Sequence, residues 1–89
     1  KFLVNDEIPW SDLEVIGVFR DVAASVSFAG WTPISEALEL ILIRCPDELP
    51  TNYGCVSWNQ VLHESRLFTL RYIERGETRA LFYKEKAKI

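Results

Sequence analysis

The chain has 89 residues, of which 48% are hydrophobic and 26% are charged. This length makes one domain, residues 1–89, and the balance is that of a globular rather than a disordered protein. No apolar run approaches the roughly 18 residues that span a bilayer, and the N-terminus lacks the order of a signal peptide, so we expect no membrane partner. Because the chain begins at Lys1 and contains no Met, we expect a processed product or a piece of a longer protein.

The net charge of −3 is unevenly distributed along the chain. Residues 1–63 carry a net charge of −6, and residues 64–89 carry +3. Such a charge dipole orients a partner even when the total is modest.

The first predicted helix follows Pro9 and Trp10. Ser11-Asp12-Leu13-Glu14 has the pattern of a capping box, in which the Ser and Glu side chains satisfy backbone N–H groups at the helix start. Apolar residues then recur at helical spacing, which predicts a helix over about residues 12–26. The many β-branched residues leave a pair of strands turning at Arg20-Asp21 as the alternative.

The second helix is predicted from Thr32-Pro33, a cap followed by proline at the first helical position, to the residues before Pro46. Its inward face comprises Ile34, Ala37, Leu38, Ile41 and Leu42, and Glu36 and Glu39 point outward. Between the first two helices, residues 27–31 run extended, with a sharp bend at Gly30.

Residues 46–56 are predicted to form a loop. Cys45 lies directly before this loop and Cys55 lies within it. A disulfide across it is sterically conceivable. Two cysteines are weak evidence for an oxidising compartment, so we favour a buried Cys45, a semi-buried loop thiol at Cys55, and the cytoplasm as the location.

The third helix begins at a second capping box, Ser57-Trp58-Asn59-Gln60, and runs to about Ser65. Trp58, Val61 and Leu62 are expected to face inward.

A β-hairpin over Leu67–Lys84 ends the chain, and its register has two interpretations. A three-residue loop Glu74-Arg75-Gly76 with Gly76 left-handed places Phe68 opposite Phe82, and leaves Arg71 and Arg79 outward and opposite each other. A two-residue Arg75-Gly76 turn places Phe68 opposite Tyr83 and lets Tyr72 stack on Arg79. We prefer the first on turn chemistry; both keep Phe68, Leu70 and Tyr72 inside.

The predicted fold class is therefore α+β, with three helices followed by a C-terminal antiparallel hairpin. The order helix, short extended piece, helix, helix, hairpin resembles that of the winged helix-turn-helix superfamily over nearly the whole chain. In that superfamily the third helix enters the major groove and the hairpin, or wing, contacts the backbone or minor groove. The resemblance implies that Trp58–Ser65 is a recognition helix and Arg71–Arg79 a wing.

The leading functional hypothesis is a non-enzymatic module that binds nucleic acid and regulates transcription. Lysines and arginines gather on the hairpin and tail, as a phosphate-binding surface requires. Amide and imidazole groups on the third helix can read base edges. The candidate residues are Asn59, Gln60, His63, Arg66, Arg71, Arg75 and Arg79.

The alternative hypothesis is a protein-interaction domain, such as an adaptor, an inhibitor or an immunity-type protein, or a homodimer. Exposed tryptophan anchors many interfaces, and the candidates are Trp10, Trp31 and Trp58. The acidic residues Asp6, Glu7, Asp12, Glu14 and Asp21 would face a basic partner.

Catalysis is poorly supported by the sequence. His63 is the single histidine, and no nucleophile motif surrounds the cysteines or serines. Cys45, Cys55 and His63 lack the paired spacing of a zinc site, and there is no glycine-rich phosphate loop. We therefore expect no catalytic residue, no metal, no cofactor and no small-molecule substrate.

Overall fold

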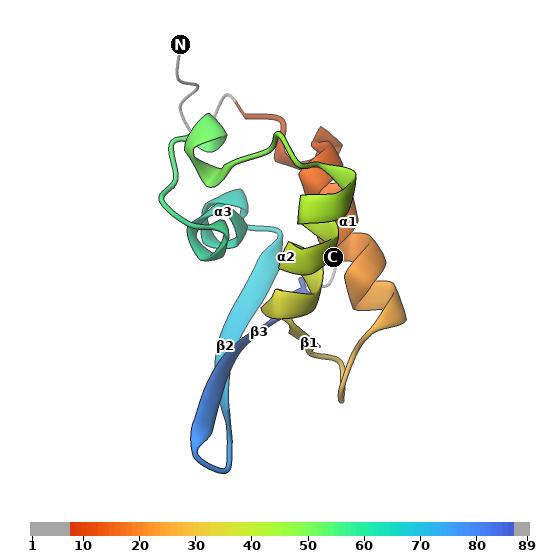
Figure 1. Cartoon of the computed structure of the whole chain (residues 1–89), viewed down its shortest axis with the longest axis vertical. Helices are drawn as coiled ribbons and strands as arrows, with labels where there is room; N and C mark the ends of the chain where they lie inside the picture. The colour runs from red at the N-terminus through yellow and green to blue at the C-terminus, as the bar shows by residue number, and fades with distance from the viewer. Residues whose placement is uncertain (1–7, 87–89) are drawn as a thin grey trace.

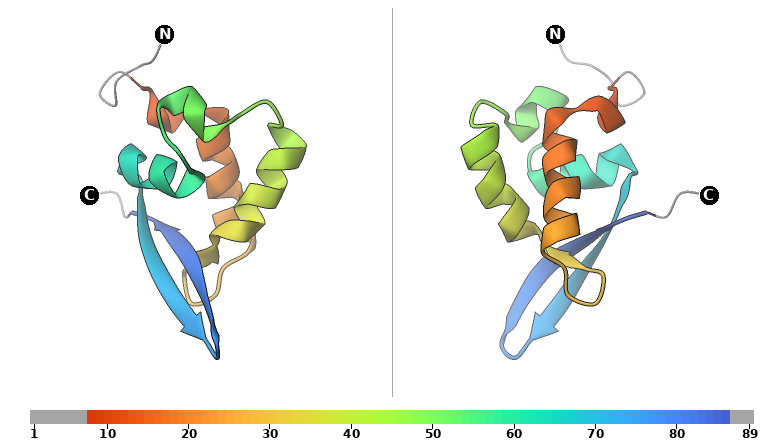
Figure 2. Two further views of the ribbon diagram at one scale, coloured as in Figure 1. Left: turned by 60° about the vertical axis from the view of Figure 1, so that its left-hand side comes forward. Right: turned by 90° about the vertical axis from the view of Figure 1, so that its right-hand side faces the viewer.

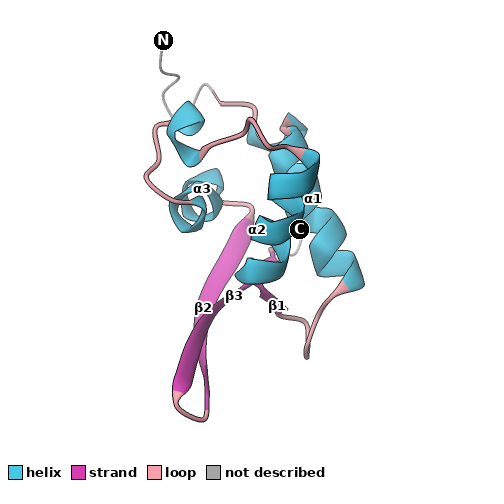
Figure 3. Cartoon of the chain, in the orientation of Figure 1, coloured by secondary structure: helices cyan, strands magenta, loops and turns pink. Residues whose placement is uncertain are grey.

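The computed structural model describes residues 8–86. It has three helices, α1 (Glu14–Ser25), α2 (Ile34–Arg44) and α3 (Trp58–Ser65), and a hairpin of β2 (Phe68–Arg75) and β3 (Thr78–Glu85). The short strand β1 (Thr32–Pro33) adds to the hairpin, giving an antiparallel sheet in the order β1-β3-β2. The helices gather at one end of the molecule and the hairpin extends from them (Figures 1 and 3). The predicted α+β class, with helices preceding a hairpin, is confirmed; Asp6, Glu7 and Lys88 lie outside the described residues.

Helix α1 is a single helix, so the alternative of two strands turning at Arg20-Asp21 is wrong. The predicted capping box at Ser11 is also wrong. Ser11 lies inside the short 3-10 helix η2 (Trp10–Asp12), and Leu13, which makes no side-chain cap bond, separates this turn from α1. The buried residues of α1 are Val15, Ile16, Val18, Phe19 and Val22. Burial of this face outweighs the weak helix propensity of its valines.

Helix α2 ends before Pro46 as predicted, but its start differs. Thr32 was expected to cap the helix; instead Thr32 and Pro33 are extended and pair with Tyr83 and Phe82 of β3. The backbone there completes the sheet, and Pro33 occupies the N-cap position without a side-chain cap bond.

The inward face of α2 is narrower than predicted. Ile34, Ala37 and Ile41 are buried and Leu38 is half-buried, whereas Leu42 is 72% exposed and the prediction for it is wrong. Its neighbour Ile43 is 75% exposed. The reason is geometric, since only the residues of α2 that face α1 and the sheet have a partner surface. Glu36 and Glu39 are exposed, as expected.

The cap of α3 is confirmed. The Gln60 N–H donates to Ser57 Oγ at 3.3 Å, while Gln60 Oε1 accepts from the Val56 N–H at 2.8 Å. Val61 and Leu62 are buried and Trp58 is half-buried. The helix ends at Arg66, whose left-handed backbone (φ 61°) redirects the chain into β2.

The segment between α2 and α3 contains the 3-10 helix η3 (Pro50–Tyr53). Cys45 and Cys55 on either side of it are free thiols, and both are buried, Cys55 more deeply than expected. Burial is the main cause that raises the pKa of both thiols, which disfavours their deprotonation.

The hairpin turns at Gly76-Glu77, and both predicted registers are wrong. Phe68 pairs with Glu85, Leu70 with Tyr83 and Tyr72 with Leu81. Gly76, with a φ of 64°, is the first residue of a two-residue loop, where II′ turns favour glycine. Phe68 is buried and Leu70 half-buried, but Tyr72, which was expected inside, is 54% exposed because it lies beyond the helices.

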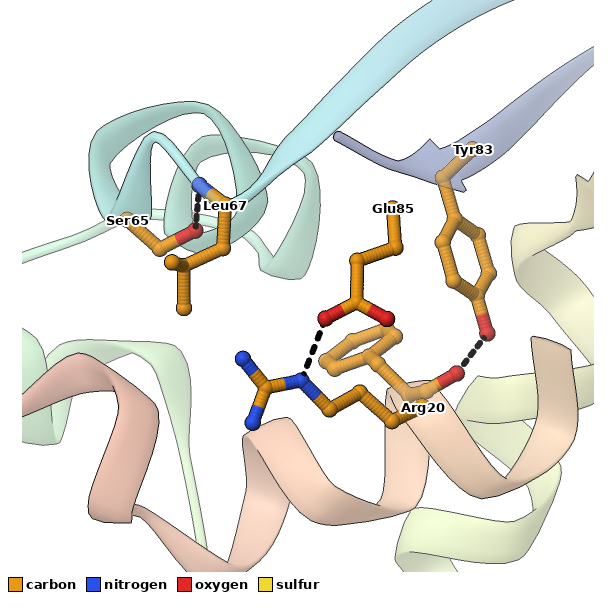
Figure 4. Close-up of polar contacts among 6 residues, drawn as sticks. Arg20, Ser65, Leu67, Tyr83 and Glu85 are labelled. Atoms are coloured by element: carbon orange, nitrogen blue, oxygen red, sulfur yellow. Dashed lines mark hydrogen bonds and ion pairs between the residues drawn. The ribbon is translucent and has the colours of Figure 1, made fainter. Parts of the chain in front are cut away.

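Polar contacts fix the base of the hairpin to the helices (Figure 4). The buried Tyr83 hydroxyl donates to the Phe19 carbonyl oxygen of α1 at 2.6 Å, and Arg20 Nε forms an ion pair with Glu85 at 2.7 Å. The Leu67 N–H donates to Ser65 Oγ at the end of α3. Around them the Phe19 ring packs edge-on to Tyr83, with centroids 5.5 Å apart. The base of the hairpin is therefore part of the core.

Candidate nucleic-acid interface

Two of the predicted residues lie on the outer face of α3, and a third directly follows the helix. Val61, Leu62 and Ser65 are buried, which leaves Asn59 and His63, four residues apart, on an outer face; Arg66 comes after the last turn in a left-handed conformation. His63 and Arg66 are exposed and Asn59 is half-buried. Gln60 stands apart, because its side-chain oxygen is engaged with the Val56 N–H.

The two outward arginines of the hairpin lie on opposite faces of the sheet, so the prediction that they oppose each other is wrong. Arg71 pairs with Phe82 and Arg79 pairs with Glu74. The register places their side chains on different faces, since neighbouring residues of a strand alternate. The like-charge repulsion expected for a direct arginine pair is thereby avoided.

On one face, two cations flank Trp31. The Arg71 guanidinium carbon lies 5.8 Å from the Trp31 ring centroid and Lys84 Nζ lies 5.7 Å from it. A cation within about 6 Å of an aromatic centroid is attracted to the ring. Both side chains are exposed, so this arrangement holds two positive charges on the surface of the hairpin.

On the other face, the Arg79 guanidinium carbon lies 4.3 Å from the Tyr72 ring centroid. The stacking predicted for the two-residue turn is therefore present, although the register differs from the one that suggested it. Arg75 pairs with Thr78 through its backbone; its side chain lies outside the described part of the structure.

Sequence reasoning missed a tight turn at Phe28–Trp31. The Phe28 N–H donates to the Trp31 carbonyl oxygen at 2.7 Å, and the Trp31 N–H donates to the Phe28 carbonyl oxygen at 3.0 Å. Ala29 (φ 55°) and Gly30 (φ 86°) are both left-handed, as a I′ turn requires. The expected bend at Gly30 exists, but Ala-Gly is not the Asn-Gly or Asp-Gly pair that signals this turn.

This turn and the hairpin border an open pocket of about 520 Å³. Phe28, which is 53% exposed, and Trp31 line one side. Arg71, Ile73 and Phe82 of the sheet line the other. The surface thus combines aromatic rings with positive charge, the two components that contact bases and phosphates.

All three tryptophans are partly buried. Trp10 and Trp58 lie on either side of Tyr53, with ring centroids 6.0 and 6.5 Å away, and Trp58 also contacts Phe19. Trp10 and Trp58 therefore join η2, η3 and α3 to the core. Trp31 instead contacts the cations Arg71 and Lys84 of the hairpin.

Among the charged residues of α1 and α2, acidic side chains outnumber basic ones. Asp12 of η2 and Glu14 at the start of α1 are exposed. Asp21 is exposed further along α1, where its carboxylate pairs with Arg44 Nη1 of α2 at 3.0 Å. Among residues 8–86, no three His, Cys, Asp or Glu side chains are grouped to hold a metal ion. None of the described helices is long and apolar enough to cross a membrane.

Comparison with known proteins identifies a fold and no function. No family model matches the sequence, and no curated protein matches it. The chain is similar to the solution NMR structure of an uncharacterized protein from Nitrosomonas europaea, with a TM-score of 0.67 at 19% sequence identity. The match covers 86% of this chain and 76% of that one. At this identity the likeness shows a shared fold alone.

Proposed function

We propose that this chain is a non-enzymatic nucleic-acid-binding module of winged-helix-like fold, with a role in transcription regulation. In this assignment α3 is the recognition helix and the β2–β3 hairpin is the wing. The element order α1-β1-α2-α3-β2-β3 and the sheet order β1-β3-β2 support it. The connection from Cys45 to Ser57 is longer than the tight turn that usually precedes a recognition helix.

The observation that carries the proposal is the location of the positive charge. Arg66, Arg71, Arg79, Lys84 and Lys86 are all exposed, and all follow α3. The exposed acidic residues of α1 and α2 all precede α3 in the chain. The hairpin carries the positive charge on both of its faces, with Arg71 and Lys84 on one and Arg79 on the other. Because phosphates dominate nucleic-acid affinity, the positive charge would orient the chain so that α3 and the hairpin face the backbone.

The outer face of α3 would then supply the base contacts. Asn59 and His63 carry donors and acceptors that can pair with base edges in the major groove. Each such contact contributes roughly 1–3 kcal/mol of discrimination. Replacing Asn59 with Ala should relax sequence preference while leaving the salt dependence of binding unchanged.

The non-enzymatic part of the proposal is supported by the state of the nucleophile candidates. Cys45 and Cys55 are buried, and burial raises the pKa of each thiol. A reactive cysteine needs an exposed thiolate instead. His63 is the only histidine of the chain.

The direct test is a titration with generic duplex DNA at increasing salt. Wild-type protein should bind at about 50 mM salt and weaken steeply above it. Replacing Arg66, Arg71 and Arg79 together with Ala should reduce the slope of log affinity against log salt by about three, close to one per phosphate contact. Arg44→Ala is the matched control, since Arg44 is also exposed but pairs with Asp21 on the acidic side. Absence of binding at low salt, or an equal effect of Arg44→Ala, would contradict the proposal.

A further inference from the structure

A groove lies between the C-terminal half of α1 and one face of α2, which run side by side (Figure 2). It has a volume of about 440 Å³. Its apolar lining residues are Val22 of α1, Val26 directly after α1, and Leu40 and Ile43 of α2. Ile43 is 75% exposed, so a large aliphatic side chain at the edge of this groove is in contact with solvent.

The rim of the groove is acidic. Asp21, Glu36 and Glu39 line it together with a single cation, Arg44. Arg44 is already paired with Asp21 at 3.0 Å, which largely neutralises that carboxylate. Glu36 and Glu39 are both exposed and lie three residues apart on α2, so they present two negative charges beside the apolar floor.

We infer that this groove binds an amphipathic helix of a partner protein that carries lysine or arginine beside its apolar stripe. The apolar stripe would cover Val22, Leu40 and Ile43, as in other helix-in-groove complexes. The basic side chains would then meet Glu36 and Glu39 at the rim. Charge complementarity of this kind selects the partner and orients it during encounter.

A second copy of this chain is a poorer occupant. A two-fold dimer places the same patch of both copies in contact, which would bring Glu36 and Glu39 of one copy close to those of the other. Repulsion between these carboxylates would oppose the burial of Ile43.

The inference does not depend on nucleic-acid binding. Within the described part of the chain, the residues that line the groove belong to α1, its C-cap residue Val26, and α2. The basic residues that carry the proposed function follow α3. One molecule can therefore hold nucleic acid and a basic helix at the same time, which would make it a bridge between the two.

The test uses the full chain and a labelled helical peptide of leucine and lysine, about 15 residues long so that a helix can form. A peptide with glutamate in place of every lysine is the control probe. Fluorescence anisotropy at low salt should show micromolar binding of the lysine peptide and none of the glutamate peptide. The Glu36→Gln, Glu39→Gln double variant should bind the lysine peptide more weakly, and the affinity that remains should depend less on salt.

The chain offers a matched pair of variants for the apolar contact. Ile43→Ala should weaken binding about tenfold, as expected when a large apolar side chain that the partner covers is truncated. Leu42→Ala should change it less than about twofold, because Leu42 is 72% exposed on the same helix but does not line the groove. Both side chains are exposed, so both variants should keep the circular dichroism spectrum of the wild type.

Several results would overturn the inference. These are equal losses from Ile43→Ala and Leu42→Ala, binding of the glutamate peptide, or no binding of the lysine peptide at all. A dimer in sedimentation that Ile43→Ala dissociates would assign the groove to a second copy instead. The Arg66, Arg71, Arg79 triple variant should retain peptide binding, so loss of the nucleic-acid function and loss of this one are separable.

Discussion

The two ends of the hairpin differ although both alternate side chains in the same way. At the base, Phe68 and Tyr83 are at most 3% exposed. Toward the turn, Tyr72 is 54% exposed, and Glu74 and Arg79 are exposed as well. The difference comes from the helices, which cover the base and leave the tip in solvent (Figures 1 and 2). One pair of strands thus closes the core at one end and carries charge outward at the other.

The largest expected effect is at the base. Phe68→Ala should lower the free energy of unfolding by about 3–5 kcal/mol, because it leaves a cavity where the ring packs against Phe19 and Tyr83. Urea denaturation followed by circular dichroism measures this loss. Such a loss is a large part of the stability of a small domain. A loss below about 1 kcal/mol, the scale of a surface change, would mean that the base is not part of the core.

A smaller loss is expected from Tyr83→Phe. It removes the hydrogen bond from the buried hydroxyl to the Phe19 carbonyl and should cost about 1 kcal/mol. Burial also raises the pKa of Tyr83 in the folded state. The unfolded chain therefore ionises first, and stability should be retained below about pH 10 and fall above it.

Tyr83→Phe should make that alkaline loss less steep. Part of the loss should remain, since the pKa of Tyr53 is also raised, mainly by burial and then by its hydrogen bond to Glu48. Urea midpoints measured across the alkaline range test this. An identical pH profile for the wild type and the variant would show that Tyr83 ionises freely in the folded state.

Thr32→Val should increase stability. Thr32 is 1% exposed, and its Oγ1 has no hydrogen-bond partner among residues 8–86. Valine has the same shape without the unsatisfied hydroxyl, so a gain of about 1 kcal/mol is expected. Thr69→Val on β2 is the control, because Thr69 is exposed. A loss of stability in thermal unfolding would show that the Thr32 hydroxyl is hydrogen-bonded.

The smallest effect is expected at the tip. Tyr72→Ala should cost only about 0.5 kcal/mol, the value of an exposed contact between a cation and an aromatic ring. A double-mutant cycle with Arg79→Ala isolates this contact, whose partners lie 4.3 Å apart. A cost near that of Phe68→Ala would remove the distinction between the base and the tip.

Part of the candidate interface could be predicted from the sequence, and part could not. The outward position of Asn59 and His63 follows from the spacing of Val61 and Leu62, and it was predictable. The position of Arg71 beside Trp31 was not, because it depends on a register that differs from both predicted ones. In the observed register Arg71 lies opposite Phe82, which pairs on its other side with Pro33, two residues after Trp31.

The sequence by itself determined the elements whose signals are local. Pro46 limits α2, Ser57 caps α3, and the separation of acidic and basic residues along the chain needs no structure to be seen. These features depend on residues a few positions apart.

Only the tertiary structure decided which faces are covered. Pairing with β3 made Thr32–Pro33 a strand, and the lack of a covering element left Leu42 and Ile43 exposed. The Tyr83–Phe19 hydrogen bond joins residues 64 positions apart. Such contacts depend on how whole elements pack, and the pattern within one segment does not contain that information.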